Sequence, residues 1–122
     1  MDKLERMMEA QRAFAQGFAD LRSLDAVGRD EWLRDTAVCM AAEAMELLAE
    51  TNWKHWKARR PLDVDAAREE VADITCFLLN AAAILGMDAD GLCEAHLAKV
   101  AKNHERQRNG YGKRAEKAGG AV

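Results

Sequence analysis

Two stretches of sequence decide the fold: residues 41–57 read AAEAMELLAETNWKHWK, and residues 68–80 read REEVADITCFLLN. Acidic residues recur three or four positions apart in both stretches, a spacing that places them on one face of an α-helix. These residues are Glu43, Glu46 and Glu50 in the first stretch and Glu70 and Asp73 in the second. Apolar residues run alongside each acidic row, so both stretches are predicted to be amphipathic helices.

The remainder of the chain also favours helices, because it holds only one proline and eight glycines. Apolar residues at helical spacing predict a first helix over about residues 1–21. A connector is expected around Gly28. A second helix should then begin after a cap at Asp30 and continue to about Arg59, unless its end unwinds around Asn52.

Pro61 separates the second predicted helix from a third, and a fourth follows after a glycine stop. The predicted boundaries are caps at Asp63 or Asp65 and at Asp88 or Asp90, ends near Leu85 and Asn109, and left-handed stops at Gly86 and Gly110. Four helices with short connections predict an all-α four-helix bundle with antiparallel neighbours. We expect one domain over residues 1–111 and a flexible tail over residues 112–122.

Composition agrees with a helical protein of the cytoplasm. Of the 122 residues, 49% are apolar and 32% are charged, and the net charge is −3. No apolar run approaches the roughly 18 residues that span a bilayer, and the N-terminus lacks the apolar core of a signal peptide. The three cysteines have no metal-binding spacing, so we expect buried thiols in a reducing compartment at Cys39, Cys76 and Cys93.

The acidic rows predict a cation site. Carboxylates at the edge of an apolar stripe are costly to desolvate, and a divalent cation compensates that cost. Oxygen ligands without histidine or cysteine favour Mg²⁺, with Mn²⁺ possible. The alternative is a set of ordinary exposed helix glutamates that form pairs such as Glu50 with Lys54.

A basic segment follows the acidic middle of the chain. Four polar residues of the fourth predicted helix share one face, and they are Lys99, Asn103, Arg106 and Gln107. Arginine, lysine and amide groups suit phosphate oxygens, so opposite a metal site this face is interpreted as a phosphate clamp. Read alone, the same face is typical of a solvated helix surface.

The order of these motifs resembles the all-α NTP pyrophosphatases, the MazG-like superfamily, and most closely its dimeric dUTPases. The resemblance covers roughly residues 40–111. Its motifs are Glu43-Ala-Met-Glu46 followed by Glu70-Val-Ala-Asp73, the segment Glu50-Thr-Asn-Trp53-Lys54-His-Trp56-Lys57, and the segment Asn103-His-Glu-Arg106-Gln107-Arg-Asn-Gly110-Tyr111. Three positions depart from the family pattern, and they are Cys76, His96 and Val100.

The resemblance implies a Mg²⁺-dependent hydrolysis of dUTP, and of dUDP, to dUMP. It implies that Glu43, Glu46, Glu70 and Asp73 bind the cations, with Glu46 or Glu50 as the base that activates water. It also assigns Tyr111 to the nucleotide phosphates and Gln11 to the base. The alternatives are a house-cleaning pyrophosphatase for dCTP or modified nucleotides and a non-catalytic helical adaptor.

Further site residues follow from position. Lys54 and Lys57 are candidates for phosphate binding, although surface lysines are equally common at such positions. Trp53 and Trp56 can stack on a base, although aromatic residues at this spacing more often pack in a core or interface. Asn80 shares a helical face with Glu70 and is a candidate for base or sugar.

The predicted partners are a nucleotide substrate and further copies of the chain. A four-helix bundle this short does not enclose a nucleotide on all sides, so we expect a homodimer or a higher homo-oligomer. Neither a membrane nor a nucleic-acid polymer is expected as a partner.

Overall fold

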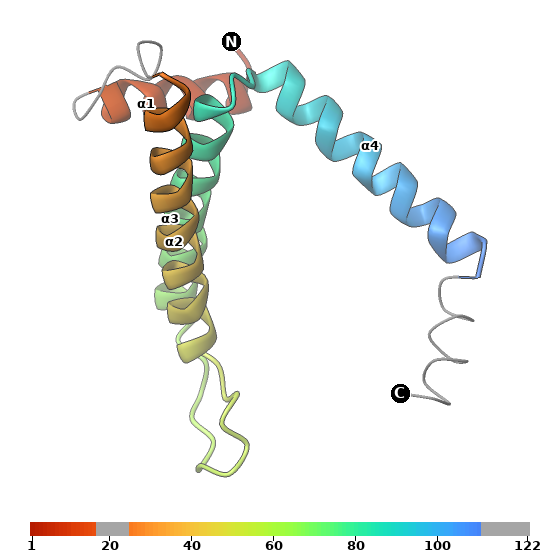
Figure 1. Ribbon diagram of the computed structural model, residues 1–122. Helices are drawn as coiled ribbons and strands as arrows, with labels where there is room; N and C mark the ends of the chain where they lie inside the picture. Colours follow the sequence, from red (N-terminus) through yellow and green to blue (C-terminus); the bar gives the residue numbers. More distant parts are fainter. Residues whose placement is uncertain (17–24, 111–122) are drawn as a thin grey trace. The chain divides into compact units, whose positions relative to one another are not determined.

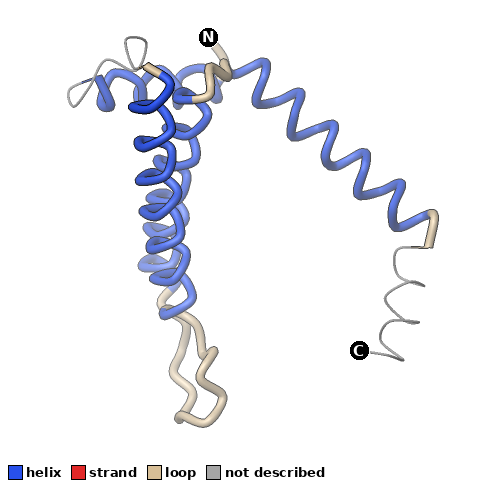
Figure 2. Tube along the Cα trace, viewed as in Figure 1, coloured by secondary structure: helices blue, strands red, loops and turns tan. Residues whose placement is uncertain are grey.

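The computed structural model describes residues 1–16 and 25–110, and within these ranges it contains helices and no strand (Figures 1 and 2). The four helices are α1 Lys3–Gln16, α2 Ala26–Ala49, α3 Val64–Ile84 and α4 Ala89–Arg108. The predicted all-α fold class is confirmed. The first helix was expected to end near Leu21, which lies outside the described residues, as does the predicted tail over residues 112–122.

The chain divides into two compact units, Met1–Asp88 with α1 to α3 and Ala89–Val122 with α4. In the first unit α2 and α3 run side by side in opposite directions, and α1 lies across one end of this pair (Figure 1). The loop between α2 and α3 forms the other end. The single domain over residues 1–111 and the place of α4 in a bundle stay predictions.

The core of the first unit lies where α1 meets α3. Its buried apolar residues are Met8 and Ala15 of α1 and Leu79, Ala82 and Ile84 of α3. None of the large side chains in the described residues is completely buried. The rest of the α2–α3 pair, which carries the acidic rows, therefore has few buried apolar side chains between its helices.

Side-chain caps fix where the helices begin. Asp2 and Glu5 form a reciprocal capping box at α1, in which each backbone N–H donates to the other residue's carboxylate. Asp63 caps α3 by accepting from the backbone N–H of Ala66 at 3.0 Å, as one of the two predicted caps. These caps satisfy N–H groups that the first helical turn leaves without a partner.

The prediction that a connector surrounds Gly28 and that Asp30 caps the second helix is wrong. Asp25 is the cap, and its Oδ1 accepts from the backbone N–H of Gly28 at 2.7 Å. Gly28 therefore lies in the first turn of α2. A residue in the first turn of a helix needs a hydrogen-bond partner for its backbone N–H, but it does not need a left-handed conformation. Glycine is therefore compatible with this position.

The other helix boundaries agree with the sequence. α2 ends at Ala49 with Glu50 as its C-cap, so the predicted unwinding around Asn52 is confirmed in place of a helix continuing to Arg59. Gly86 takes the predicted left-handed conformation, with φ of 73°. The N–H groups of Gly86 and Met87 donate back to the carbonyls of Ala83 and Ala82, the pattern of a Schellman motif.

The prediction of buried cysteines is wrong, because Cys39, Cys76 and Cys93 are free thiols on exposed positions. No single helix in the described residues is long and apolar enough to cross a membrane, although α3 and α4 together, as a bent pair, meet that test by length and composition. The cytoplasmic location stays a prediction.

Candidate functional site

Three carboxylates meet between α2 and α3. Glu43 and Glu46 lie one turn apart on α2, Glu70 lies on α3, and each offers an oxygen within 4.8 Å of the others. Glu43 and Glu70 are half-buried and Glu46 is exposed. One oxygen of Glu70, Oε2, is buried and has no hydrogen-bond partner. The sequence prediction that these residues converge is therefore matched by their positions.

The cluster is electrostatically strained without a cation. A hydrogen bond with Glu43, burial, and the negative charges of Glu43, Glu46 and Asp73 together raise the pKa of Glu70 from 4.5 to about 7. Asp73 is exposed and lies outside the group of three, but its charge still acts on Glu70. A shared proton or a cation relieves this repulsion. Glu70 Oε2, which is buried and has no hydrogen-bond partner, is an atom that a cation could bind.

The donor set fits a hard divalent cation. Carboxylate oxygens are the ligands that Mg²⁺ and Mn²⁺ prefer, and no histidine or cysteine belongs to the cluster. Glu43, Glu46 and Glu70 would hold such an ion, with Asp73 beside them. Glu50, the other predicted base, lies at the C-cap of α2 and is not part of the group of three.

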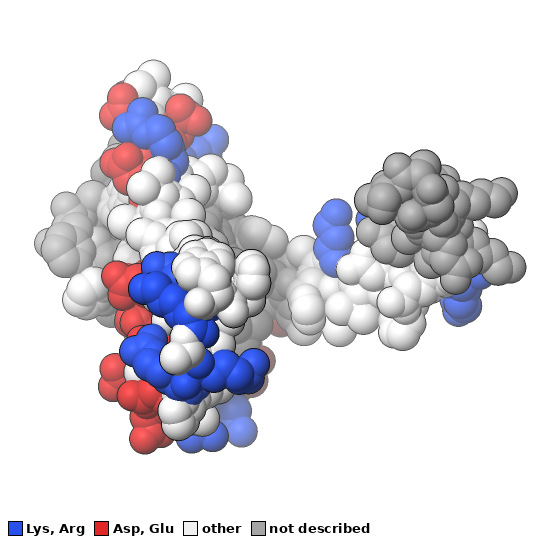
Figure 3. All heavy atoms as spheres, turned by 90° about the horizontal axis from the view of Figure 1, so that it is seen from below, with Lys and Arg blue, Asp and Glu red and all other residues white. Residues whose placement is uncertain are grey.

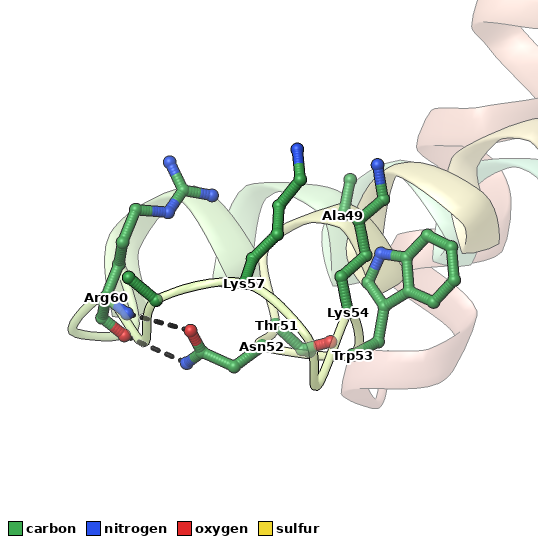
Figure 4. A pocket seen from close by; sticks show the side chains of 8 residues that line it. Ala49, Thr51, Asn52, Trp53, Lys54, Lys57 and Arg60 are labelled. Atoms are coloured by element: carbon green, nitrogen blue, oxygen red, sulfur yellow. Dashed lines mark hydrogen bonds between the residues drawn. The ribbon is translucent and has the colours of Figure 1, made fainter.

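The loop after α2 is closed by one asparagine. The side chain of Asn52 donates from Nδ2 to the carbonyl of Arg60 at 2.9 Å, and its Oδ1 accepts from the backbone N–H of Arg60 at 2.8 Å (Figure 4). The amide nitrogen and the amide oxygen of the side chain thereby both bond to one residue, eight positions along the chain. This pair of bonds fixes the width of the loop.

The closed loop presents cations on one side. A hollow of about 600 Å³ is lined by Lys54, Lys57 and Arg60, whose side chains extend to the same side of the loop (Figure 4). Viewed from the loop end, lysine and arginine side chains gather there beside acidic ones (Figure 3). Lys54 and Lys57 were predicted to bind phosphate, but Arg60 was missed. Its signal in the sequence is a second arginine directly before Pro61.

The tryptophans of this loop contact each other. Trp53 and Trp56 pack edge to face with ring centroids 6.1 Å apart, and Lys54 Nζ lies 5.3 Å from the centre of the Trp53 ring. Both rings are exposed, Trp53 by 44% and Trp56 by 64%. Trp53 lines the cationic hollow. The two rings therefore lie with the loop cations and not with the other residues predicted to bind the base.

The predicted base-binding residues Gln11 and Asn80 line a second hollow, of about 650 Å³. Asn80 is buried and donates from Nδ2 to Thr36 Oγ1 at 3.2 Å, while its Oδ1 has no hydrogen-bond partner. The remaining lining residues are Phe14, Ala15, Gly28, Glu31, Trp32, Asp35, Thr36, Cys39 and Phe77. Thr36 was missed, because a single threonine within a helix carries no signal of its own.

The second hollow and the carboxylates lie in register along the two helices. Thr36 and Glu43 lie seven positions apart on α2, and Asp73 and Asn80 lie seven positions apart on α3. Seven residues are about two helical turns, so both members of each pair lie on the same face. The antiparallel helices therefore place the hydrogen-bonded pair of Thr36 and Asn80 about 10 Å along the helix axis from the acidic cluster.

The predicted phosphate clamp lies on α4, in the second unit. Its residues Lys99, Asn103, Arg106 and Gln107 are exposed and share one helical face. Tyr111, the last member of that set, lies outside the described residues. The structure leaves the role of this face a prediction.

The model of a family described as dUTPase matches residues 3–83. The dCTP pyrophosphatase of Enterobacteria phage T4 is 33% identical over 104 residues, a match that covers 66% of this chain and 61% of that protein. The chain thus spans less than two thirds of the length of this relative. No solved structure shows a significant match. The family match covers more than half of the chain and includes the whole acidic cluster, and the chain therefore belongs to the dUTPase family.

Proposed function

We propose that this chain is a divalent-cation-dependent nucleotide pyrophosphohydrolase that converts a pyrimidine deoxynucleoside triphosphate to its monophosphate and pyrophosphate. The observation that carries the proposal is the group of Glu43, Glu46 and Glu70, whose oxygens lie within 4.8 Å of one another and include the unpaired Glu70 Oε2. Three carboxylates this close are unfavourable unless a cation or a proton compensates their charge.

The order of features along α2 matches the parts of a nucleotide. Thr36 and Asn80 line one hollow, the carboxylates follow about two turns later, and the loop cations Lys54, Lys57 and Arg60 come last. A nucleotide that lies along the helix would place its base in the first hollow and its phosphates between the acidic cluster and the loop. The phosphates would then lie between the negative cluster, which would hold the cation, and the positive side chains of the loop, an order of charges that suits a metal-bound polyphosphate.

Each group has a chemical task in this arrangement. A cation held by the cluster would neutralise phosphate charge and lower the pKa of a bound water. Lys54, Lys57 and Arg60 would hold the departing pyrophosphate by charge-assisted hydrogen bonds. Water attacks the phosphorus nearest the sugar, and its proton passes to a carboxylate. The bond from that phosphorus to the bridging oxygen breaks, and the oxygen leaves as part of pyrophosphate. Glu46 suits the role of base because it is exposed and belongs to the cluster, and Glu50 is the other candidate.

Two substrates have support from different comparisons. The matched family is described as dUTPase, which favours dUTP. The T4 relative is described as a dCTP pyrophosphatase, which favours dCTP. Both bases are pyrimidines, and the hollow around Asn80 is where the choice between them would be made.

We also propose that the chain acts as a homo-oligomer. Three apolar residues of α3 and the residue that caps its C-terminal end recur at every seventh position and are all at least 45% exposed, namely Val64, Val71, Leu78 and the C-cap Leu85. Apolar residues at seven-residue spacing form the seam through which helices pair. A second copy of the chain offers the same apolar stripe. Pairing of the two stripes would cover apolar side chains that are exposed in the single chain.

The test is a panel of deoxynucleoside triphosphates and diphosphates, assayed for pyrophosphate or phosphate release with and without Mg²⁺. We expect Mg²⁺-dependent release of pyrophosphate from dCTP or dUTP. Glu46→Gln or Asp73→Asn should abolish turnover while the helical circular dichroism is unchanged. Glu69→Gln, an exposed neighbour of the cluster, should keep full activity. Absence of release from every nucleotide would support the non-catalytic adaptor instead.

A further inference from the structure

Thr36 and Asn80 are the two buried polar residues in the described part of the chain, and they bond to each other. Thr36 is 3% exposed and Asn80 is 7% exposed. Asn80 Nδ2 lies 3.2 Å from Thr36 Oγ1, in a hydrogen bond that joins α3 to α2. The structure describes every residue of α2, and Thr36 is the only one of them that is buried. The one side chain that α2 buries is therefore polar, and it is bonded to α3.

This polar pair is a weak source of stability. A hydrogen bond within the protein replaces hydrogen bonds to water, so its net contribution is small, and Asn80 Oδ1 is buried without a hydrogen-bond partner. Apolar side chains of the same shape in both positions are often as stable or more stable. A buried polar contact is better suited to fixing how two helices align, because its groups have partners in only one register.

The carboxylates do not fix this alignment themselves. In the antiparallel pair each step forward on α2 is matched by a step back on α3, so Glu43 is level with Asp73 and Glu46 with Glu70. The acidic residues lie three positions apart on each helix, and a slip of three residues therefore still brings two carboxylates level with each other. Their negative charges repel, so without a cation they oppose the observed register instead of selecting it.

The polar pair does not tolerate the same slip. In the two possible directions, the side chains level with the pair would lack an amide and a hydroxyl: they are Cys39 or Leu33 opposite Asn80, and Ala83 or Phe77 opposite Thr36. Both buried polar groups would then lose their partner. An unsatisfied buried amide and hydroxyl are unfavourable, so the slipped alignments are excluded by a penalty that apolar residues at these two positions would not impose.

We infer that the hydrogen bond between Thr36 and Asn80 sets the register of α2 against α3 and thereby holds Glu43 and Glu46 against Glu70. The observed register is the one in which oxygens of these three carboxylates lie within 4.8 Å of one another. Thr36 and Asn80 are thus positioning residues, which act on the cation through carboxylates about two helical turns away. The inference rests on the proposed function for the cation site, but neither on the hydrolysis nor on the choice of base.

The register is measured as a distance between two spin labels by pulsed electron paramagnetic resonance on the full chain. The labels are attached at Asp30→Cys on α2 and Asp65→Cys on α3, which are exposed positions near opposite ends of the helix pair. The native thiols are removed by Cys39→Ala, Cys76→Ala and Cys93→Ala. A slip of three residues changes the distance by roughly 4–5 Å. We expect one narrow distance with Thr36 and Asn80 in place, and a broadened or shifted distribution when Thr36→Val is combined with Asn80→Leu.

Cation affinity and stability are measured on the same variants without labels. The double variant Thr36→Val with Asn80→Leu should keep its helical circular dichroism and at least the wild-type melting temperature, yet bind Mg²⁺ on the order of tenfold more weakly in calorimetry. The exchanged variant, Thr36→Asn with Asn80→Thr, again offers one amide and one hydroxyl in the same register. It should restore both the affinity and the narrow distance. Thr75→Val is the control, because the hydroxyl of Thr75 donates to the carbonyl of Val71 within α3 and its loss should leave the affinity unchanged.

Four results would overturn the inference. They are unchanged Mg²⁺ affinity in the double variant, weaker affinity with an unchanged distance, an exchanged variant that folds without regaining affinity, and loss of helical structure in the double variant, which would mean that the pair supports folding itself. The proposed function fails separately. If the wild-type protein binds Mg²⁺ and the variants behave as expected, but no nucleotide releases pyrophosphate, the hydrolysis is refuted and the positioning role stands.

Discussion

Binding of a divalent cation to the acidic cluster is expected to release protons, and Glu70 determines how many. The hydrogen bond with Glu43, burial and nearby negative charges raise the pKa of Glu70 to about 7, so at pH 7 its carboxyl is about half protonated. A carboxyl must lose its proton to bind a cation. We therefore expect about 0.5 proton to be released per cation at pH 7 and almost none near about pH 9.

Isothermal titration calorimetry measures this release. Mg²⁺ or Mn²⁺ is titrated in two buffers that differ in ionisation enthalpy, and the dependence of the observed heat on that enthalpy gives the number of protons. Glu70→Gln should bind the cation more weakly and lose this release. Glu69→Gln, one residue away and exposed, should keep both. The reasoning is refuted if the wild-type protein releases no proton at pH 7, or if Glu70→Gln releases as many protons as the wild type.

Four shorter predictions follow from named contacts. Without a cation, the melting temperature should fall as pH rises from about 4.5 to about 7. The reason is that the stabilisation from protonated Glu70 is complete below the pKa of this carboxyl in the unfolded chain and is lost as pH rises through its raised pKa in the folded protein. Glu70→Gln should flatten this dependence in melts followed by circular dichroism. Asn52→Ala should remove both bonds to Arg60, cost about 1–3 kcal/mol in denaturant unfolding, and raise the KM for nucleotide more than it lowers kcat. Leu78→Glu should yield a smaller species in sedimentation, since it places a charge in the exposed apolar stripe. Gly86→Ala should cost about 1 kcal/mol in unfolding, because φ is 73° and open space surrounds the added methyl group, so the cost is conformational.

The fold was largely predictable because local signals determine helices. Apolar and acidic spacing located the first three helices, and caps and glycine stops located the fourth; Asp63 and Gly86 marked boundaries by side-chain chemistry that acts within a few residues. The start of α2 was misplaced because two aspartates, Asp25 and Asp30, carry the same capping chemistry and flank a glycine. Which of them caps the helix depends on how the preceding chain approaches, and this is not a local property.

The end of α2 shows a second limit. The sequence after Glu50 contains no helix breaker before Pro61, yet the helix ends at Ala49. Two hydrogen bonds from Asn52 to Arg60 close a loop across eight residues, and they use backbone groups that a continued helix would need within itself. An asparagine favours such loops, so its presence suggested unwinding, but its partner was not evident from spacing.

The candidate site was predictable wherever residues share one helix and harder to see wherever two helices must pair. Spacing of three and four residues identified the carboxylates, because that period is a property of each helix alone. Thr36 and Asn80 lack such a signal individually. Their signal is the equal spacing of seven residues to a carboxylate on each helix, which acquires meaning only for antiparallel helices in one register. Once the acidic residues of α2 and α3 are taken to face each other, the same register brings Thr36 to Asn80. The cation cluster and the hollow that would receive the base are therefore set by one alignment of two helices. A slip of α3 by one turn would disrupt both at once, so cation affinity and base preference are expected to be lost together in variants that shift α3.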